Sequence, residues 1–125
     1  MYYTTSQGVY AKIRNSYEVN MSNVLLELNK VIKSKKNQSK TKSYTADLLE
    51  SGLNKCAEKF GEEAIELIVA AVNKDNENFN NEAADVLFHL LVLIESKETS
   101  INAVLKILEN RMGISGHLEK ETRTQ

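Results

Sequence analysis

The chain has 125 residues, so we expect one domain, and its hydrophobic (42%) and charged (26%) fractions are ordinary for a soluble globular protein. Sixteen Lys and Arg against seventeen Asp and Glu give a net charge of −1, which argues against a strongly basic protein that coats nucleic acid or membranes. The single cysteine, Cys56, excludes an internal disulfide framework and a cysteine-based zinc cluster.

The first 20 residues differ in composition from the rest of the chain. They contain four of the five tyrosines and show no helical periodicity, so we interpret 1–20 as an N-terminal extension of unknown role and 21–125 as the domain. They lack the charged and apolar segments of a signal peptide, and no apolar run in the chain approaches the ~20 residues that span a bilayer. We therefore expect a cytoplasmic protein with no membrane or nucleic-acid partner.

The remaining residues favour helices, because the chain has no proline and only five glycines. Apolar residues at helical spacing predict four helices, which cover about residues 22–34, 43–73 (starting between 43 and 46), 79–96 and 101–112. Ser22 and Ser100 are the expected N-caps of the first and last helices, and Gly113 is expected to end the last. The links are short and polar, which predicts antiparallel neighbours. The fold class is therefore all-α, an antiparallel bundle of four to five helices.

The second predicted helix has an acidic stripe formed by Glu62, Glu63 and Glu66. At 100° per residue, Lys55 and Lys59 share this side of the helix, and most large apolar residues lie opposite. Taken alone, this segment reads as an amphipathic helix with a solvated face.

The third predicted helix is apolar around most of its circumference, so we expect it to be buried. Its narrow polar stripe contains Glu82, Asp85 and His89. Burying an ionised carboxylate costs several kcal/mol unless it is paired or binds a metal. Asp85, in the middle of the helix, is therefore the residue that is hardest to explain by folding alone.

An antiparallel hairpin brings the two stripes to the same level. Glu66 lies roughly 10 Å before the turn and Asp85 roughly 10 Å after it. Up to five carboxylates would then gather, and their repulsion would be relieved by a cation. Ligand sets made only of oxygen suit Mg²⁺ or Mn²⁺ and disfavour zinc.

This arrangement predicts metal-assisted attack of water on a phosphoanhydride. Lys55 and Lys59 are placed to hold phosphate oxygens, and a carboxylate that is not fully engaged with metal is a candidate general base. The candidate catalytic residues are Glu62, Glu63, Glu66 and Asp85.

Three runs, 52–55 (GLNK), 59–66 (KFGEEAIE) and 82–92 (EAADVLFHLLV), strongly resemble the phosphoribosyl-ATP pyrophosphohydrolase family of the all-α, MazG-like nucleotide pyrophosphohydrolases. The segment 43–45 resembles the family's entry into the second helix, and 111–116 followed by 119–120 resembles its ending. The resemblance covers about residues 22–123, so the extension at 1–20 has no counterpart. The metal-binding cysteines of the cyclohydrolase that is often fused upstream are absent, so the chain resembles the stand-alone form.

The resemblance implies that phosphoribosyl-ATP, a nucleotide, is hydrolysed to phosphoribosyl-AMP and pyrophosphate in the second step of histidine biosynthesis. It also implies a homodimer whose helices complete one another's bundle. The implied Mg²⁺ ligands are Glu62, Glu63, Glu66, Glu82 and Asp85.

Several alternatives remain open at this stage. The same carboxylates would serve a house-cleaning nucleoside triphosphate pyrophosphohydrolase, or they would form interhelix salt bridges with Lys55 and Lys59 in a non-catalytic helical dimer. His89 is either a core histidine or a second-shell donor to Asp85. The link 33–42 holds Lys35, Lys36, Lys40 and Lys42, which are either solvated or contact substrate phosphates. Cys56 is expected to be a small buried hydrophobe.

Overall fold

The computed structural model describes residues 23–39 and 43–113. This part contains five helices and no strand, which confirms the all-α prediction. Several expectations lie outside the described residues: the extension at 1–20, the Ser22 cap, Lys40, Lys42, and the 114–116 and 119–120 parts of the ending. The helices are α2 (Val24–Ser34), α3 (Tyr44–Ser51), α4 (Leu53–Val72), α5 (Asn76–Ser96) and α6 (Ile101–Met112).

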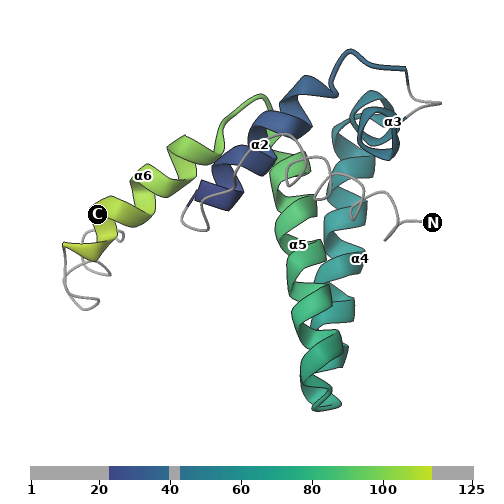
Figure 1. Cartoon of the computed structure of the whole chain (residues 1–125), viewed down its shortest axis with the longest axis vertical. Coiled ribbons are helices and arrows are strands. Elements are labelled where there is room, and N and C mark those ends of the chain that lie inside the picture. The colour runs from purple at the N-terminus through teal and green to yellow at the C-terminus, as the bar shows by residue number, and fades with distance from the viewer. Residues whose placement is uncertain (1–22, 40–42, 114–125) are drawn as a thin grey trace.

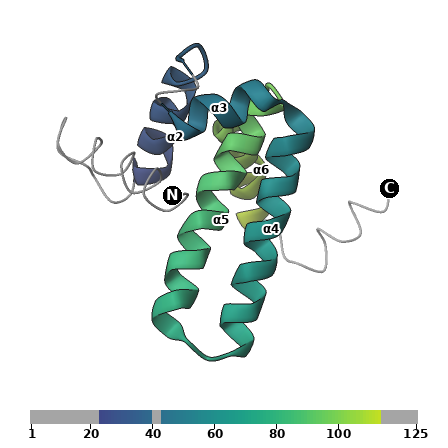
Figure 2. The same ribbon diagram turned by 90° about the vertical axis from the view of Figure 1, so that its right-hand side faces the viewer.

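Helices α4 and α5 form a long antiparallel hairpin (Figure 2). The turn between them is tighter than expected, because Asp75 caps α5 and the helix begins at Asn76 rather than near Phe79. The Asp75 Oδ1 atom accepts a hydrogen bond of 3.2 Å from the Asn78 backbone N–H, which satisfies one of the free donors at the helix start. The hairpin sets the two acidic stripes side by side.

The predicted second helix is wrong in one respect, because it is broken into α3 and α4 at Gly52. This residue has φ +96° and ψ 176°, a conformation accessible essentially only to glycine. The Gly52 carbonyl still accepts a hydrogen bond of 3.1 Å from the Cys56 N–H, so α4 starts immediately after the break. As a result α3 lies across the upper end of the hairpin and contacts both α4 and α5 (Figure 2).

Helix α5 is the central element, since α2, α3 and α4 all pack against it. The core gathers in its upper half, around Phe88, Leu91 and Val92, with Leu28 and Ile32 from α2. Cys56 is fully buried there, as expected, and its thiol donates a 3.3 Å hydrogen bond to the Leu48 carbonyl.

Helix α6 leaves the top of α5 and extends to one side, where its contacts are with α2 (Figure 1). The predicted Ser100 cap is confirmed, because its hydroxyl accepts a 3.1 Å hydrogen bond from the Ala103 N–H. Gly113 is the C-cap but has φ −86°, so the helix ends without a left-handed residue. In the described part of the chain, every helix is too short or too polar to cross a lipid bilayer.

Candidate active site

The inner faces of α4 and α5 bring three carboxylates together. Glu63 and Glu66 of α4 and Glu82 of α5 each offer an oxygen, and these three oxygens lie within 4.8 Å of one another. Glu63 is 3% exposed and Glu82 6% exposed, whereas Glu66 opens to solvent. Three negative charges this close, two of them desolvated, repel one another strongly unless a cation lies between them. We refer to Glu63, Glu66 and Glu82 as the carboxylate triad.

Asp85 lies one helical turn beyond Glu82 and is 4% exposed. Its pKa is raised from 3.8 to about 6, first by burial and then by the neighbouring charges of Glu82 and Glu66. No group in 23–39 or 43–113 donates a hydrogen bond to its buried Oδ2 atom. A buried carboxylate oxygen that accepts no hydrogen bond is suited to bind a cation, because the ion takes the place of the hydrogen-bond donor. The donor set therefore fits a hard divalent cation.

Glu62 is not a member of the carboxylate triad. Its Oε2 atom lies 3.1 Å from Lys59 Nζ, and the hydrogen bond and charge of Lys59 lower the pKa of this exposed carboxyl. The reason is geometric, because residues three apart on a helix are neighbours and Lys59 lies one turn before Glu62. The structure thus brings together three of the five expected ligands, with Asp85 beside them, and places Glu62 in an ion pair.

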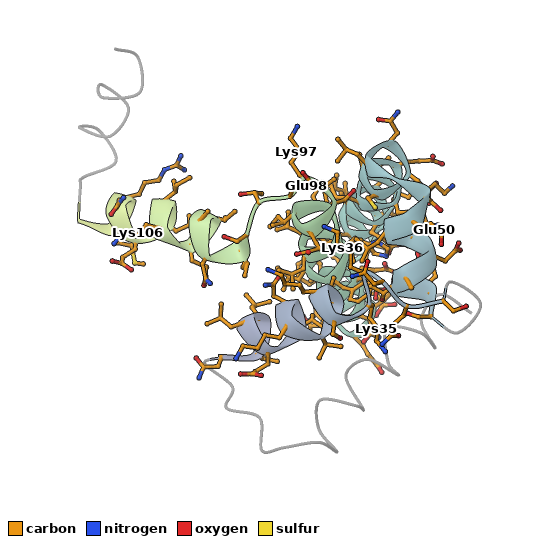
Figure 3. The ribbon with its side chains drawn as sticks, turned by 90° about the horizontal axis from the view of Figure 1, so that it is seen from above. Lys35, Lys36, Glu50, Lys97, Glu98 and Lys106 are labelled. Atoms are coloured by element: carbon orange, nitrogen blue, oxygen red, sulfur yellow. The ribbon has the colours of Figure 1, made fainter. Side chains whose placement is uncertain are left out.

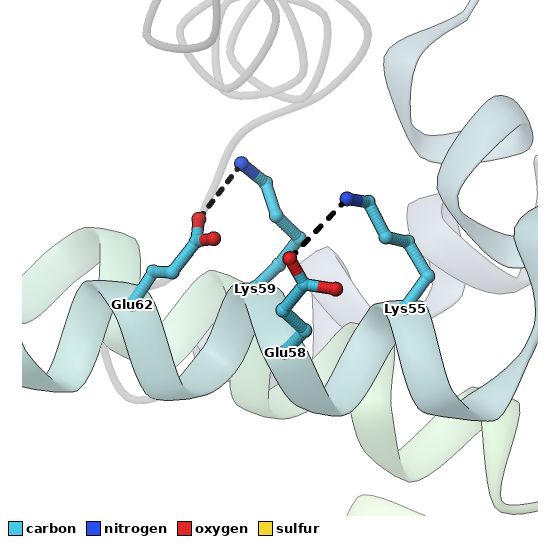
Figure 4. A network of polar contacts seen from close by, with 4 residues as sticks. All are labelled: Lys55, Glu58, Lys59 and Glu62. Carbon is cyan, nitrogen blue, oxygen red and sulfur yellow. Dashed lines mark hydrogen bonds and ion pairs between the residues drawn. The ribbon is translucent and has the colours of Figure 1, made fainter.

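The two expected phosphate-binding lysines, Lys55 and Lys59, precede the triad residues along α4, and Figure 4 shows each beside a glutamate of the same helix. Lys59 pairs with Glu62, and Lys55 Nζ lies 3.5 Å from the nearest carboxylate oxygen of Glu58. Both pairs join residues three apart within α4 and bridge no second helix.

His89 is fully buried one turn beyond Asp85. Burial lowers its pKa from 6.5 to about 4, with a smaller lowering from the charge of Lys59, so its imidazole is neutral at pH 7. Its ring meets the rings of Phe88 and Tyr44 edge-on, with centroids 5.2 and 6.1 Å apart. The second-shell role of His89 toward Asp85 stays a prediction.

Figure 3 shows two lysines of the lysine-rich link, Lys35 and Lys36, at the end of the bundle seen from above. Lys36 Nζ lies 3.9 Å from a carboxylate oxygen of Glu95, a buried residue near the end of α5. This pair ties the end of α2 to α5. Glu95 is some ten residues beyond Asp85 on α5, about 15 Å along the helix, so this end of the link lies well above the triad.

Sequence reasoning did not predict the contact between Tyr44 and His89. The break at Gly52 turns α3 back over α4 and α5, and this brings the Tyr44 ring against His89. The only available signal was a glycine inside a helical pattern, which does not reveal the sign of φ.

Comparison with known proteins gives a consistent result. The family described as phosphoribosyl-ATP pyrophosphohydrolase matches residues 25–112. A protein of Dinoroseobacter shibae named phosphoribosyl-ATP pyrophosphatase is 48% identical over 100 residues, which cover 80% of this chain and 98% of that protein. Proteins of the same name from Ruegeria sp. and Rhodobacter capsulatus are 45% and 46% identical, over 80% and 79% of this chain and 95% and 96% of theirs.

Proposed function

The chain belongs to the phosphoribosyl-ATP pyrophosphohydrolase family, and on that premise we propose that it hydrolyses phosphoribosyl-ATP to phosphoribosyl-AMP and pyrophosphate, the second step of histidine biosynthesis. The observation that carries the proposal is the carboxylate triad with Asp85 buried beside it. Family membership names the substrate, and the oxygen-rich site supplies a chemistry that suits it. The chain is accordingly an enzyme that we place in the cytoplasm.

The proposed cofactor is Mg²⁺, with Mn²⁺ as a substitute, held by Glu63, Glu66, Glu82 and Asp85. Glu62 is the fifth proposed ligand, and it joins the set if Lys59 transfers to a substrate phosphate. When bound, such an ion neutralises the phosphates and lowers the pKa of a water molecule.

The protein's own residues then perform three tasks. The carboxylates orient the ion and the water, and one carboxylate not fully engaged with metal accepts the water's proton. Lys59 and Lys55, which precede the triad residues on α4, bind phosphate oxygens and offset the charge that develops on the leaving pyrophosphate. The α4–α5 hairpin holds these groups on rigid helices, so that little reorganisation is needed.

Product analysis tests this function. The protein is incubated with phosphoribosyl-ATP and, separately, with a panel of deoxynucleoside triphosphates, each with Mg²⁺ and with EDTA. We expect Mg²⁺-dependent release of pyrophosphate, fastest from phosphoribosyl-ATP. Faster turnover of the deoxynucleotides would instead assign the site to house-cleaning hydrolysis, and release that is unaffected by EDTA would contradict the proposed metal.

We also propose that the chain works as a homodimer, with the outer face of α4 at the interface. This face lies opposite the buried Cys56 and Ala70 and carries large exposed apolar side chains: Ile65 (64% exposed), Ile68 (61%), Val69 (52%) and Val72 (73%). Each would contribute roughly 1.5–3 kcal/mol if it were fully buried.

The spacing of this face suits a second copy of the same helix. Residues 61, 65, 68 and 72 follow a heptad-like rhythm. In an antiparallel pair about a two-fold axis, Ile65 of one protomer meets Ile68 of the other, and Val72 meets Gly61, where a missing side chain leaves room. Light scattering at micromolar concentration tests the mass, and a monomer would contradict this interface.

A further inference from the structure

Helix α3 is the shortest of the described helices, and it packs on two buried side chains of the hairpin. Its 8 residues lie across the upper end of α4 and α5 (Figure 2). The Leu48 carbonyl on α3 accepts the 3.3 Å hydrogen bond from the Cys56 thiol on α4. The Tyr44 ring on α3 meets the His89 ring on α5 at a centroid distance of 6.1 Å. Cys56 and His89 are both fully buried, so α3 is part of what keeps water from them.

The break at Gly52 separates α3 from the helix that follows. Helix α4 starts its own hydrogen bonds at this residue, since the Gly52 carbonyl accepts a 3.1 Å bond from the Cys56 N–H. Isolated helices shorter than roughly 12–15 residues are marginal in water, so α3 depends on its contacts with the hairpin. Short segments of this kind can unfold locally while the rest of a protein stays folded. Helix α3 can therefore unfold as far as Gly52 without disturbing α4.

The folded position of α3 buries one hydroxyl group at a cost. Thr45, in the first turn, is fully buried, and its Oγ1 atom makes no hydrogen bond with any residue in 23–39 or 43–113. A buried hydroxyl without a partner destabilises the state that buries it, because water satisfies the same group once it is exposed. Unfolding of α3 exposes Thr45 to water. The closed state is therefore less stable than the burial of Ala46 and Leu48 alone would make it.

We propose that α3 is a lid that opens by local unfolding up to Gly52, and that the unpaired Thr45 hydroxyl keeps its closed state marginal. Opening removes the cover that α3 provides to Cys56 on α4 and to His89 on α5. His89 lies one turn beyond Asp85, so the lid opens next to the candidate active site. The lid goes beyond the proposed function, because it requires neither the metal nor the substrate.

The single cysteine of the chain makes this opening measurable. Cys56 is fully buried in the closed state, so the rate at which Ellman's reagent labels the native protein in EDTA reports how often its cover opens. Local unfolding of one short helix exposes little surface, so labelling by this route hardly changes at low urea concentration. Labelling through global unfolding accelerates steeply with urea instead. We expect the weak urea dependence in the wild-type chain.

Two variants should shift the opening in opposite directions. Thr45→Val keeps the shape of the side chain and removes the unpaired hydroxyl, so it should slow labelling by roughly 10-fold. Ser43→Ala removes the cap of α3, whose hydroxyl oxygen accepts a 3.1 Å hydrogen bond from the Ala46 N–H, and should accelerate labelling by about 5-fold. Ser100→Ala is the matched control, because it removes a cap of the same 3.1 Å length from α6, and it should label at the wild-type rate.

Three results would overturn the lid. Steep urea dependence in the wild-type chain would show that Cys56 is reached only when the whole chain unfolds. An unchanged rate in Thr45→Val would show that the buried hydroxyl does not destabilise the closed state. Equal acceleration in Ser43→Ala and Ser100→Ala would show that the effect is not specific to α3. The proposed function is tested separately by pyrophosphate release, and its failure would leave these outcomes unchanged.

Discussion

The two faces of α4 differ in chemistry. A single chain in water favours exposed charges and buried apolar side chains, and each face of α4 shows the opposite. The inner face buries the carboxylate of Glu63 against α5, whereas the outer face leaves Ile65, Ile68 and Val72 more than half exposed. Buried charge and exposed hydrocarbon both cost free energy in a lone chain. The proposed function assigns a different partner to each face, a cation to the inner face and a second copy of the chain to the outer face.

The largest expected effect concerns the inner face. Asp85→Asn should lower turnover roughly a thousand-fold, because removing a ligand forfeits several kcal/mol of transition-state stabilisation from the ion. The variant should still fold, since the amide is nearly isosteric with the carboxyl. Steady-state pyrophosphate release measures the loss, and Glu77→Gln, an exposed carboxylate in the first turn of the same helix, should retain wild-type turnover. Near-normal activity in Asp85→Asn would remove the inner face from the catalytic mechanism.

The second prediction concerns the outer face. Ile68→Glu should convert the proposed dimer to a monomer, because it places two like charges at the centre of an apolar contact. Light scattering and sedimentation velocity measure the mass. Ile107→Glu on α6, where the side chain is 52% exposed, is the comparison variant and should remain dimeric. If Ile107→Glu dissociates the protein and Ile68→Glu does not, the interface lies on α6 instead.

Much of this contrast could be predicted from the sequence. An aspartate inside an almost wholly apolar helix indicated that Asp85 is buried, which the structure confirms. Antiparallel geometry predicted that Glu66 lies level with Asp85, whereas the structure gathers Glu66 with Glu63 and Glu82. The break at Gly52 could not be predicted, because a helical pattern runs through it and the sign of φ depends on the tertiary structure. The contact between Glu62 and Lys59 was also missed, since side-chain rotamers near a solvated surface are not encoded in periodicity.

The third prediction uses pH to measure how much the ionised Asp85 carboxylate destabilises the metal-free fold. The pKa of Asp85 is raised in the folded chain from 3.8 to about 6, so the native state binds its proton more tightly than the unfolded state does. Protonated Asp85 therefore stabilises the metal-free fold at pH 4. This contribution to the free energy of unfolding is lost as the pH rises toward 6, and it amounts to at most about 3 kcal/mol. Asp85→Asn should be more stable than wild type by up to this amount at pH 7 in EDTA.

Urea unfolding in EDTA at pH 4 and pH 7 measures that difference between the two proteins. The comparison is needed because His89 acts in the opposite direction. The pKa of His89 is lowered to about 4, so its contribution to the free energy of unfolding is present above pH 6.5 and is lost as the pH falls. In the wild-type protein this change opposes the change that comes from Asp85. Both proteins retain His89, so its contribution cancels in the difference between their free energies of unfolding. If the difference in the free energy of unfolding between the two proteins does not change with pH, folding does not raise the pKa of Asp85.

The smallest expected effect distinguishes what Gly61 does in the proposed dimer from what it does in the fold of a single chain. Gly61 lies within α4 among the exposed apolar residues, and a Cβ atom added there meets nothing within 4 Å inside the chain. Gly61→Ala should therefore stabilise a monomeric background such as Ile68→Glu by roughly 1 kcal/mol through helix propensity. In the dimer the added methyl group would press on Val72 of the opposing helix, so the dissociation constant should rise. Gly52→Ala is the control, and it should destabilise both states because Gly52 has φ +96°. If Gly61→Ala stabilises monomer and dimer equally, no partner helix approaches α4 at this glycine, and the proposed register is wrong.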